Sequence, residues 1–139
     1  MNLGKFDIAD VTAALDRKSI SARELVDLQI SKIKLRQDEL NCYVTLDTKK
    51  AHIAAALSDQ RRNDNKKLSA IDGIPIAVKD NINVAGLPTR NGSKFNHHVS
   101  GDADVIKVLR KSGAIIIGKL NMDECAIGGT TNNPHYGPT

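Results

Sequence analysis

The chain has 139 residues, of which 40% are hydrophobic and 26% charged, an ordinary balance for a globular domain. No run approaches the roughly 18 consecutive apolar residues of a membrane-spanning helix, and the first residues lack the apolar core of a signal peptide. The two cysteines, Cys42 and Cys125, lie far apart in the sequence and form no closely spaced pair. We therefore expect a single domain that contacts no membrane, in a reduced, cytoplasmic setting.

The formal net charge of +4 raises the question of a nucleic-acid partner. The densest basic cluster, residues 61–67, is interrupted by Asp64 and two asparagines, and no aromatic residue interleaves with it. Such a run is more often a solvated surface segment than a phosphate-binding stripe. A modest electrostatic attraction to RNA stays open.

Apolar spacing and capping residues predict the elements of the first half of the chain. Asp7 is placed to cap a first helix, and Ser21 with Glu24 forms a capping box, in which each side chain satisfies a backbone amide near the other. Asp47 or Thr48 caps an alanine-rich helix. The expected elements are a helix at residues 8–15, a helix at 22–35, a strand at 42–46 and a helix at 48–62.

The second half predicts two buried strands, at residues 73–79 and 114–117, on either side of a helix that carries Val105, Ile106 and Leu109. Pro75 lacks an amide hydrogen and belongs near the start of the first strand. Asp102 is placed to cap the helix, and Gly113 to end it. Strands and helices that alternate in this way predict an α/β fold with helices covering a sheet.

Two patterns in the sequence resemble binding motifs but lack residues that the binding would require. Residues 113–119 have the glycine and lysine spacing of a phosphate-binding loop, but three isoleucines fill the turn and Leu120 stands where a Ser or Thr would hold the metal. This run predicts a strand. The adjacent His97 and His98 have no Cys or carboxylate at metal-ligand spacing, and we expect neither a metal nor a cofactor.

Lys79 is the candidate for chemistry that the residues themselves offer. It follows a buried strand and stands at the carboxyl end of that strand, where active-site residues of α/β sheets gather. Desolvation disfavours an ammonium, so a lysine in such surroundings can act as a neutral base. The alternative is that Lys79 marks the point where the strand meets water.

The tail of the chain, residues 128–139, consists almost entirely of residues that favour loops. Long loops without secondary structure in compact domains are usually functional, or belong to a larger structure. We expect Gly128, Gly129 and Thr130 to lie in a loop that contacts substrate. We also expect the fold to continue beyond this tail.

Several motifs along the chain resemble those of the amidase signature family. Residues 73–81 (GIPIAVKDN) resemble its lysine motif, G-(I/V)-P-x-x-(I/V)-K-D, and residues 86–93 fall where it has a G-x-x-T-x-x-G-S loop. Residues 112–124 match its next strand and turn, and residues 132–139 match the approach to its serine-rich segment. The resemblance spans nearly the whole chain and is specific from Asp72 onward.

The resemblance implies a catalytic role for Lys79. The family's triad is a serine nucleophile, a second serine in a cis peptide bond, and a lysine that takes a proton through the second serine. The serine-rich segment of the family does not occur in these residues, so neither triad serine can be named. The implied fold is a mixed sheet flanked by helices, of which residues 1–139 would be the N-terminal portion of a single amidase domain.

Three functions are compatible with this resemblance. The first is a hydrolase that cleaves the C–N bond of small linear amides, which residues 133–137 favour. The second is the A subunit of a glutamyl- or aspartyl-tRNA amidotransferase, which residues 119–124 favour. That protein would release ammonia from glutamine and work with partner subunits and tRNA. The third is a non-catalytic α/β fragment.

Overall fold

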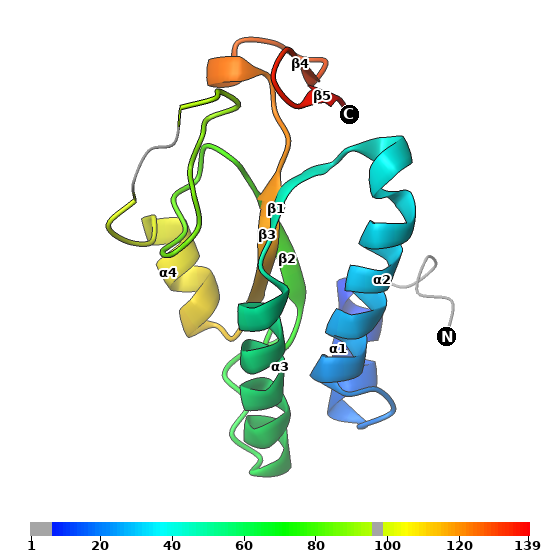
Figure 1. Ribbon diagram of the computed structural model, residues 1–139. Coiled ribbons are helices and arrows are strands. Elements are labelled where there is room, and N and C mark those ends of the chain that lie inside the picture. Colours follow the sequence, from blue (N-terminus) through cyan, green and yellow to red (C-terminus); the bar gives the residue numbers. More distant parts are fainter. Residues whose placement is uncertain (1–6, 96–98) are drawn as a thin grey trace.

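The computed structural model describes residues 7–95 and 99–139 (Figure 1). Its elements, in chain order, are α1 (Ile8–Asp16), α2 (Ala22–Leu40), β1 (Tyr43–Leu46), α3 (Thr48–Asn63), β2 (Pro75–Lys79), α4 (Asp104–Lys111), β3 (Ile115–Leu120), the 3₁₀ turn η2 (Glu124–Ala126), β4 (Asn132–Asn133) and β5 (Gly137–Pro138).

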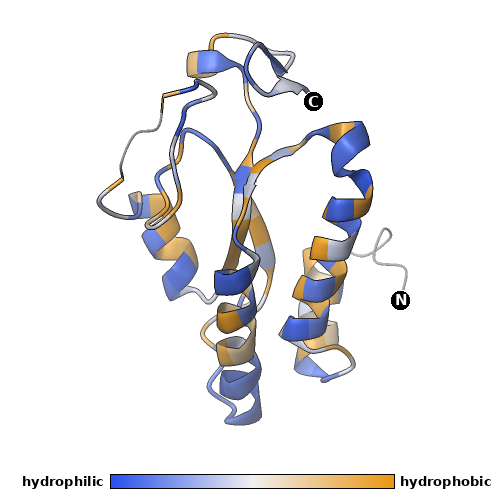
Figure 2. Cartoon of the chain, in the orientation of Figure 1, coloured by the Kyte–Doolittle hydropathy of each residue, from blue (hydrophilic) through white to orange (hydrophobic). Residues whose placement is uncertain are grey.

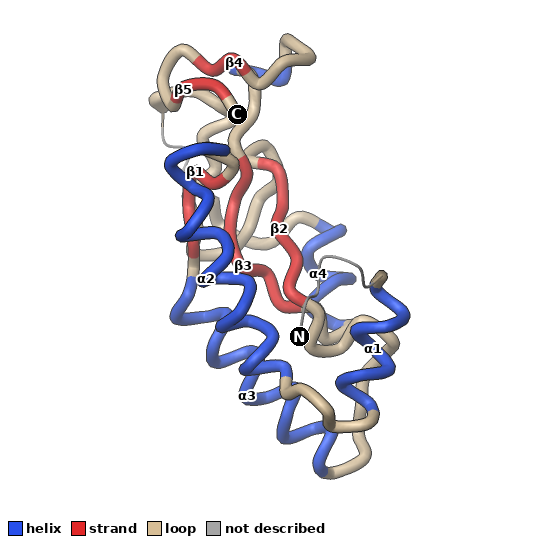
Figure 3. The backbone as a smooth tube through the Cα atoms, turned by 90° about the vertical axis from the view of Figure 1, so that its right-hand side faces the viewer, coloured by secondary structure: helices blue, strands red, loops and turns tan. Residues whose placement is uncertain are grey.

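The centre of the molecule is a three-stranded sheet in the order β1-β3-β2. Strand β3 lies in the middle, antiparallel to β1 and parallel to β2, so the sheet is mixed. Helices α1, α2 and α3 lie on one side of this sheet and α4 lies on the other (Figures 1 and 3). The expected α/β fold, with a mixed sheet flanked by helices, is confirmed.

Alternation along β3 supplies a core to each side of the sheet. Ile115 and Ile117 belong to the larger apolar cluster, which includes Leu25 and Ala55 of α2 and α3. Ile116 belongs to a smaller cluster with Ile106 of α4. In Figure 2 apolar residues colour parts of the central strands, while much of α2 and the lower part of α3 are hydrophilic.

The predicted helix starts are mostly confirmed, whereas α2 runs to Leu40, beyond its expected end near residue 35. Asp7 and Ser21 cap α1 and α2, the latter within the predicted capping box, and Asp47 caps α3. Gly113 follows α4 with a positive φ of 88°. Asp102, however, does not cap α4. Its carboxylate instead accepts from the amide of Ala85 at 2.7 Å and from Arg110 at 2.9 Å, so it joins the preceding loop to the side of the helix.

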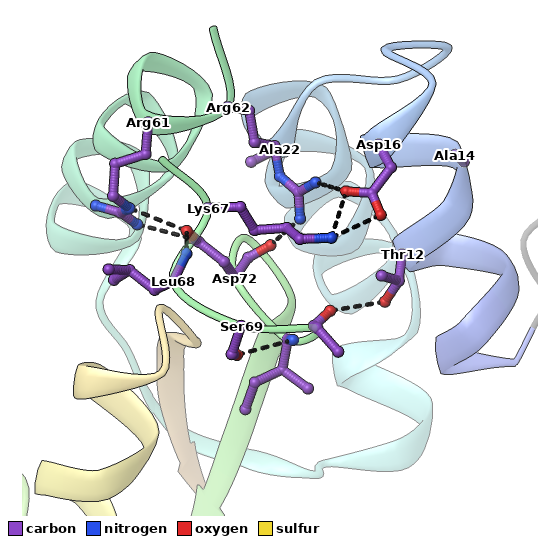
Figure 4. A network of polar contacts seen from close by, with 12 residues as sticks. Thr12, Ala14, Asp16, Ala22, Arg61, Arg62, Lys67, Leu68, Ser69 and Asp72 are labelled. Carbon is purple, nitrogen blue, oxygen red and sulfur yellow. Dashed lines mark hydrogen bonds and ion pairs between the residues drawn. The ribbon is translucent and has the colours of Figure 1, made fainter. Parts of the chain in front are cut away.

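The two arginines of the basic cluster are committed to contacts inside the molecule (Figure 4). Arg61 holds the buried carboxylate of Asp72 through two hydrogen bonds, of 3.0 and 2.6 Å. Arg62 donates to the carboxylate of Asp16 and to the Asp72 carbonyl oxygen. Lys67 also contacts Asp16, at 2.7 Å. Much of this cluster therefore ties the end of α3 to α1 and to the approach to β2.

Asp72 makes the stability of this region depend on pH. Burial alone would raise the pKa of Asp72, but hydrogen bonds from Arg61 and from the Leu68 amide outweigh it and lower the pKa below its usual value. A carboxyl whose pKa is lower in the folded state stabilises the fold above its unfolded pKa. This contribution is lost as the pH falls through the folded value.

We predict that Asp72→Asn lowers the free energy of unfolding by about 1–3 kcal/mol at pH 7, because the charged hydrogen bonds are lost. The difference from the wild-type chain should shrink as the pH falls below about 4, the unfolded pKa of an Asp, toward the lower folded pKa of Asp72. Urea unfolding between pH 3 and pH 7 measures both effects. Asp104→Asn is the control, because its pair with Lys107 is exposed. Equal effects of the two substitutions would contradict the prediction.

Candidate active site at the carboxyl edge of the sheet

Parallel strands β2 and β3 end at the same edge of the sheet, and Lys79 is the last residue of β2. It lies opposite Leu120, the last residue of β3. The preceding residue, Val78, is buried, whereas the side chain of Lys79 is exposed. The expected position at a strand end is therefore confirmed, but the buried surroundings expected for this lysine are not present within the described residues.

The residue after Lys79 belongs to a buried ion pair. Asp80 has essentially no exposed surface, and its carboxylate lies 3.1 Å from the ammonium of Lys119, which is equally buried. Lys119 also donates to the Pro88 carbonyl oxygen at 3.1 Å and to the Thr89 hydroxyl at 3.2 Å. Burial lowers the pKa of Lys119, and the hydrogen bond and charge of Asp80 oppose this effect.

Lys119 corrects an expectation from the sequence. The strand was expected to end at residue 117, but β3 continues to Leu120 and contains Lys119. The same finding confirms that residues 113–119 are not a phosphate-binding loop, because this run is mainly strand. A lysine within an apolar strand requires a buried partner, and that requirement was the signal that could have revealed the pair with Asp80.

The loop that joins β2 to α4 folds back over the strand ends. The amide of Arg90 donates to the Asp80 carboxylate at 3.1 Å, and the Arg90 guanidinium donates to the hydroxyl of Thr45 in β1 at 3.0 Å. Gly92 has a φ of 71°, and a Cβ there would lie 2.8 Å from the carbonyl oxygen of Asp123. The loop and the segment after β3 therefore pass too close for any side chain at this position.

The tail of the chain is more ordered than its sequence predicted. Strands β4 and β5 form a small antiparallel hairpin. The buried side chain of Asn133 donates to the carbonyl oxygens of Gly92 and Met122, and accepts from the amides of His135 and Tyr136. Side-chain amides thus replace the apolar contacts that a longer hairpin would use, and composition alone does not reveal them.

Gly128, Gly129 and Thr130 lie in the exposed segment between η2 and this hairpin. The carboxylate of Asp123 accepts from the Thr130 amide at 3.2 Å and from the next two amides, which fixes the end of the segment. A Cβ at Gly129 would meet no atom within 4 Å. This segment follows β3 beyond the same edge of the sheet as Lys79 (Figure 3). Within the described ranges, no hydrogen bond joins it to Lys79.

Among residues 7–95 and 99–139, no group of three or more His, Cys, Asp or Glu side chains is placed to hold a metal ion. His97 and His98 lie outside the described residues. No helix in the described part of the chain is long and apolar enough to cross a membrane.

Fold and strand-end geometry together define an α/β protein with polar residues gathered at the carboxyl edge of a mixed sheet. Residues 24–139 match the Amidase family, and the chain belongs to this family. Over its whole length the chain is 37% identical to the A subunit of glutamyl-tRNA(Gln) amidotransferase from Lachnospira eligens, and spans 29% of that protein. It is 34% identical to the corresponding protein from Anaeromyxobacter sp. (strain K), over 98% of this chain and 28% of the relative.

Solved structures show the same architecture. A structure described as an inhibitor-bound vestigial complex related to an s-triazine catabolic enzyme superposes with a TM-score of 0.92 and 31% identity, over 96% of this chain and 30% of that one. The peptide amidase of Stenotrophomonas maltophilia superposes with a TM-score of 0.84 and 28% identity, over 88% of this chain and 26% of that one. The chain therefore spans less than a third of the length of these relatives.

The contrast between the two lysines yields a prediction about stability. Lys119→Ala leaves the Asp80 carboxylate buried without its cation, which should lower the free energy of unfolding by about 3–5 kcal/mol. Lys79→Ala removes an exposed side chain and should change it by less than about 0.5 kcal/mol. Denaturant unfolding of both variants, followed by circular dichroism, measures the difference. Comparable stabilities would show that Lys119 is not required for the fold.

Proposed function

We propose that the protein to which these residues belong is an amidase that hydrolyses the C–N bond of linear amides. Residues 1–139 would be the N-terminal portion of a single amidase domain whose serine-rich segment lies outside them, and its location would be cytoplasmic. The observation that carries the proposal is the lysine motif itself. It places Lys79 at the carboxyl end of β2 in a chain whose residues 24–139 match the Amidase family.

In the proposed reaction Lys79 is the base of a Ser–cis-Ser–Lys triad. Its neutral amine takes a proton from the bridging serine, which in turn takes the proton of the nucleophilic serine. The serine oxygen then attacks the amide carbonyl, the C–N bond breaks, and ammonia or an amine leaves with the returned proton. Water attacks the resulting acyl-enzyme and releases the carboxylic acid. The exposed side chain of Lys79 is free to meet a serine supplied by another segment.

Gly128, Gly129 and Thr130 are proposed to line the substrate site. The space around Gly129 is open, and the end of the segment is fixed by Asp123. A backbone held at one end and lacking side chains can come close to a ligand. No cofactor enters this proposal.

A specific observation favours a second candidate function. The relatives from Lachnospira eligens and Anaeromyxobacter sp. are each named as the A subunit of glutamyl-tRNA(Gln) amidotransferase. In that case the same triad would release ammonia from glutamine, and the protein would work with partner subunits that act on tRNA. A non-catalytic α/β fragment is the remaining alternative.

The role of Lys79 is tested in the full-length protein that carries these residues. Lys79→Ala should lower kcat by at least about 10²–10⁴-fold, because general-base assistance is lost, with little change in stability. Ammonia release from propionamide, benzamide and L-glutamine is the measurement, and Lys107→Ala is the control at an exposed lysine. The isolated 139-residue chain, which lacks the serine-rich segment, should release no ammonia. Near-normal turnover by Lys79→Ala would remove this lysine from the mechanism.

The hydrolase and the amidotransferase differ in what they need for turnover. A hydrolase should release ammonia from simple amides on its own, and the rate should not respond to added tRNA. An amidotransferase component should prefer L-glutamine and depend on partner subunits and glutamylated tRNA. Ammonia release by the full-length protein, measured alone and with each addition, separates them. We expect turnover of simple amides without partners, and dependence on partners would favour the second function.

A further inference from the structure

Both the backbone and the carboxylate of Asp80, the residue that follows the proposed base, contact other parts of the chain. Its amide donates to the carbonyl oxygen of Leu120 at 3.1 Å, and its carbonyl oxygen accepts from the amide of Asn91 at 3.4 Å. Its carboxylate meets the ammonium of Lys119 and the amide of Arg90, each at 3.1 Å. Asp80 is therefore fixed to β3 and to the loop before α4 at once.

An irregularity in β3 is what brings Lys119 to Asp80. Ile76 pairs with Ile116 and Ala77 pairs with Gly118, so Ile117 stands without a partner in β2. Without this extra residue, alternation would place Lys119 on the face of Ile117, toward α2 and α3. With it, Lys119 lies opposite Val78, which faces α4. Extra residues of this kind re-aim side chains and are common beside active sites.

The residue next to this irregularity has to be glycine. Gly118 lies against β1, and a Cβ there would collide with the carbonyl oxygen of Thr45. The close approach of β1 therefore falls at the residue that follows the extra residue of β3 and precedes Lys119.

The ammonium of Lys119 joins the residue after β2 to the following loop, and besides its ion pair it donates to the Asp80 carbonyl oxygen at 3.4 Å. Besides Asp80 it reaches the Pro88 carbonyl oxygen and the Thr89 hydroxyl, which belong to the loop that covers the strand ends. Buried ion pairs are weak evidence for stability, because a well-packed apolar pair is often as stable. The directional contacts of this pair, rather than its net stabilisation, are what an apolar pair could not reproduce.

We propose that Lys119 and Asp80 are positioning residues for Lys79, an inference that rests on the proposed catalytic role of Lys79. Lys79 is the last residue of β2, so a fixed Asp80 holds the backbone on the carboxyl side of Lys79 and limits the directions in which its side chain can leave the strand. Lys79 itself is exposed and has the freedom of a long side chain. Holding its backbone removes part of that freedom before substrate arrives, and misplacing a reacting group by about 1 Å can lower a rate by 10²-fold.

The test separates positioning from stability in the full-length protein. Lys119→Met leaves Asp80 unpaired, whereas the double variant Lys119→Met/Asp80→Asn removes both charges and keeps the side-chain volumes. Thr89→Val removes one contact of the ammonium and retains the ion pair, so it tests the proposal even where Lys119→Met fails to fold. For each variant, kcat and KM per folded molecule are measured on whichever of propionamide, benzamide and L-glutamine the wild type hydrolyses fastest. The midpoint of thermal unfolding is measured alongside, with Lys107→Met as the control.

We expect the thermal midpoint of the double variant to recover toward the wild-type value while its kcat stays at least about tenfold lower with KM little changed. Thr89→Val should show a smaller fall in kcat. Recovery of kcat in step with stability, or wild-type kcat in both the double variant and Thr89→Val, would show a purely structural role. Lys79→Ala tests the proposed catalytic role of Lys79 separately from the positioning role of Lys119 and Asp80. Normal turnover there would overturn the proposed function and this inference together, whereas a purely structural role of the pair leaves that function standing.

Discussion

The ammonium of Lys119 lies inside the sheet with no exposed side-chain surface, and a charge in that position needs both an anion and further hydrogen-bond acceptors. Asp80 supplies the anion, and the loop at Pro88 and Thr89 supplies acceptors. This requirement brings β3 into contact with Asp80 and Thr89, which lie 39 and 30 residues before Lys119 in the chain. The shape of the carboxyl edge, including the course of the chain beyond Lys79, depends on it.

Hydrogen bonds from polar side chains also hold the tail of the chain against the strand ends. The side chain of Asn121, directly beyond β3, donates to the carbonyl oxygen of Gly137 at 2.9 Å. The backbone amide of Asn121 donates to the Cys42 carbonyl oxygen. Asn41 donates to the carbonyl oxygens of Tyr136 and Pro138. The hairpin is therefore held to the ends of α2 and β3 by side-chain amides. Few apolar contacts are needed, which explains how a segment of loop-forming residues has a defined structure.

Local features could be predicted from the sequence, whereas features with distant partners could not. The caps at Asp7 and Ser21 and the end of α4 at Gly113 depend on atoms a few residues away, and all were predicted. Asp102 has the composition of a cap, but Arg110 and the Ala85 amide compete for its carboxylate. Which donor prevails depends on where the loop passes, and local sequence does not determine that.

The candidate site divides in the same way. The position of Lys79 at the end of β2 follows from an apolar run and a family motif, both of which can be read along the chain. The direction of Lys119 could not be predicted, because alternation from Ile115 and Ile117 points it to the wrong face. Only the pairing of β2 with β3 reveals the extra residue that corrects the direction. A single residue without a partner in the neighbouring strand moves each later side chain of its own strand to the opposite face of the sheet. Sequence periodicity therefore predicts the wrong face beyond such a residue.

At the carboxyl edge of the sheet, the groups that hold the backbone are distinct from the side chain of Lys79. The groups that fix the end of β2 contact one another within residues 80–120, and none of them is the exposed side chain of Lys79. The chain spans less than a third of its relatives, so most of any substrate site would come from other segments. These contacts hold the strand end that carries Lys79 from within the described residues. Under the proposed function, this part of the chain would fix the base, and other segments would select the amide.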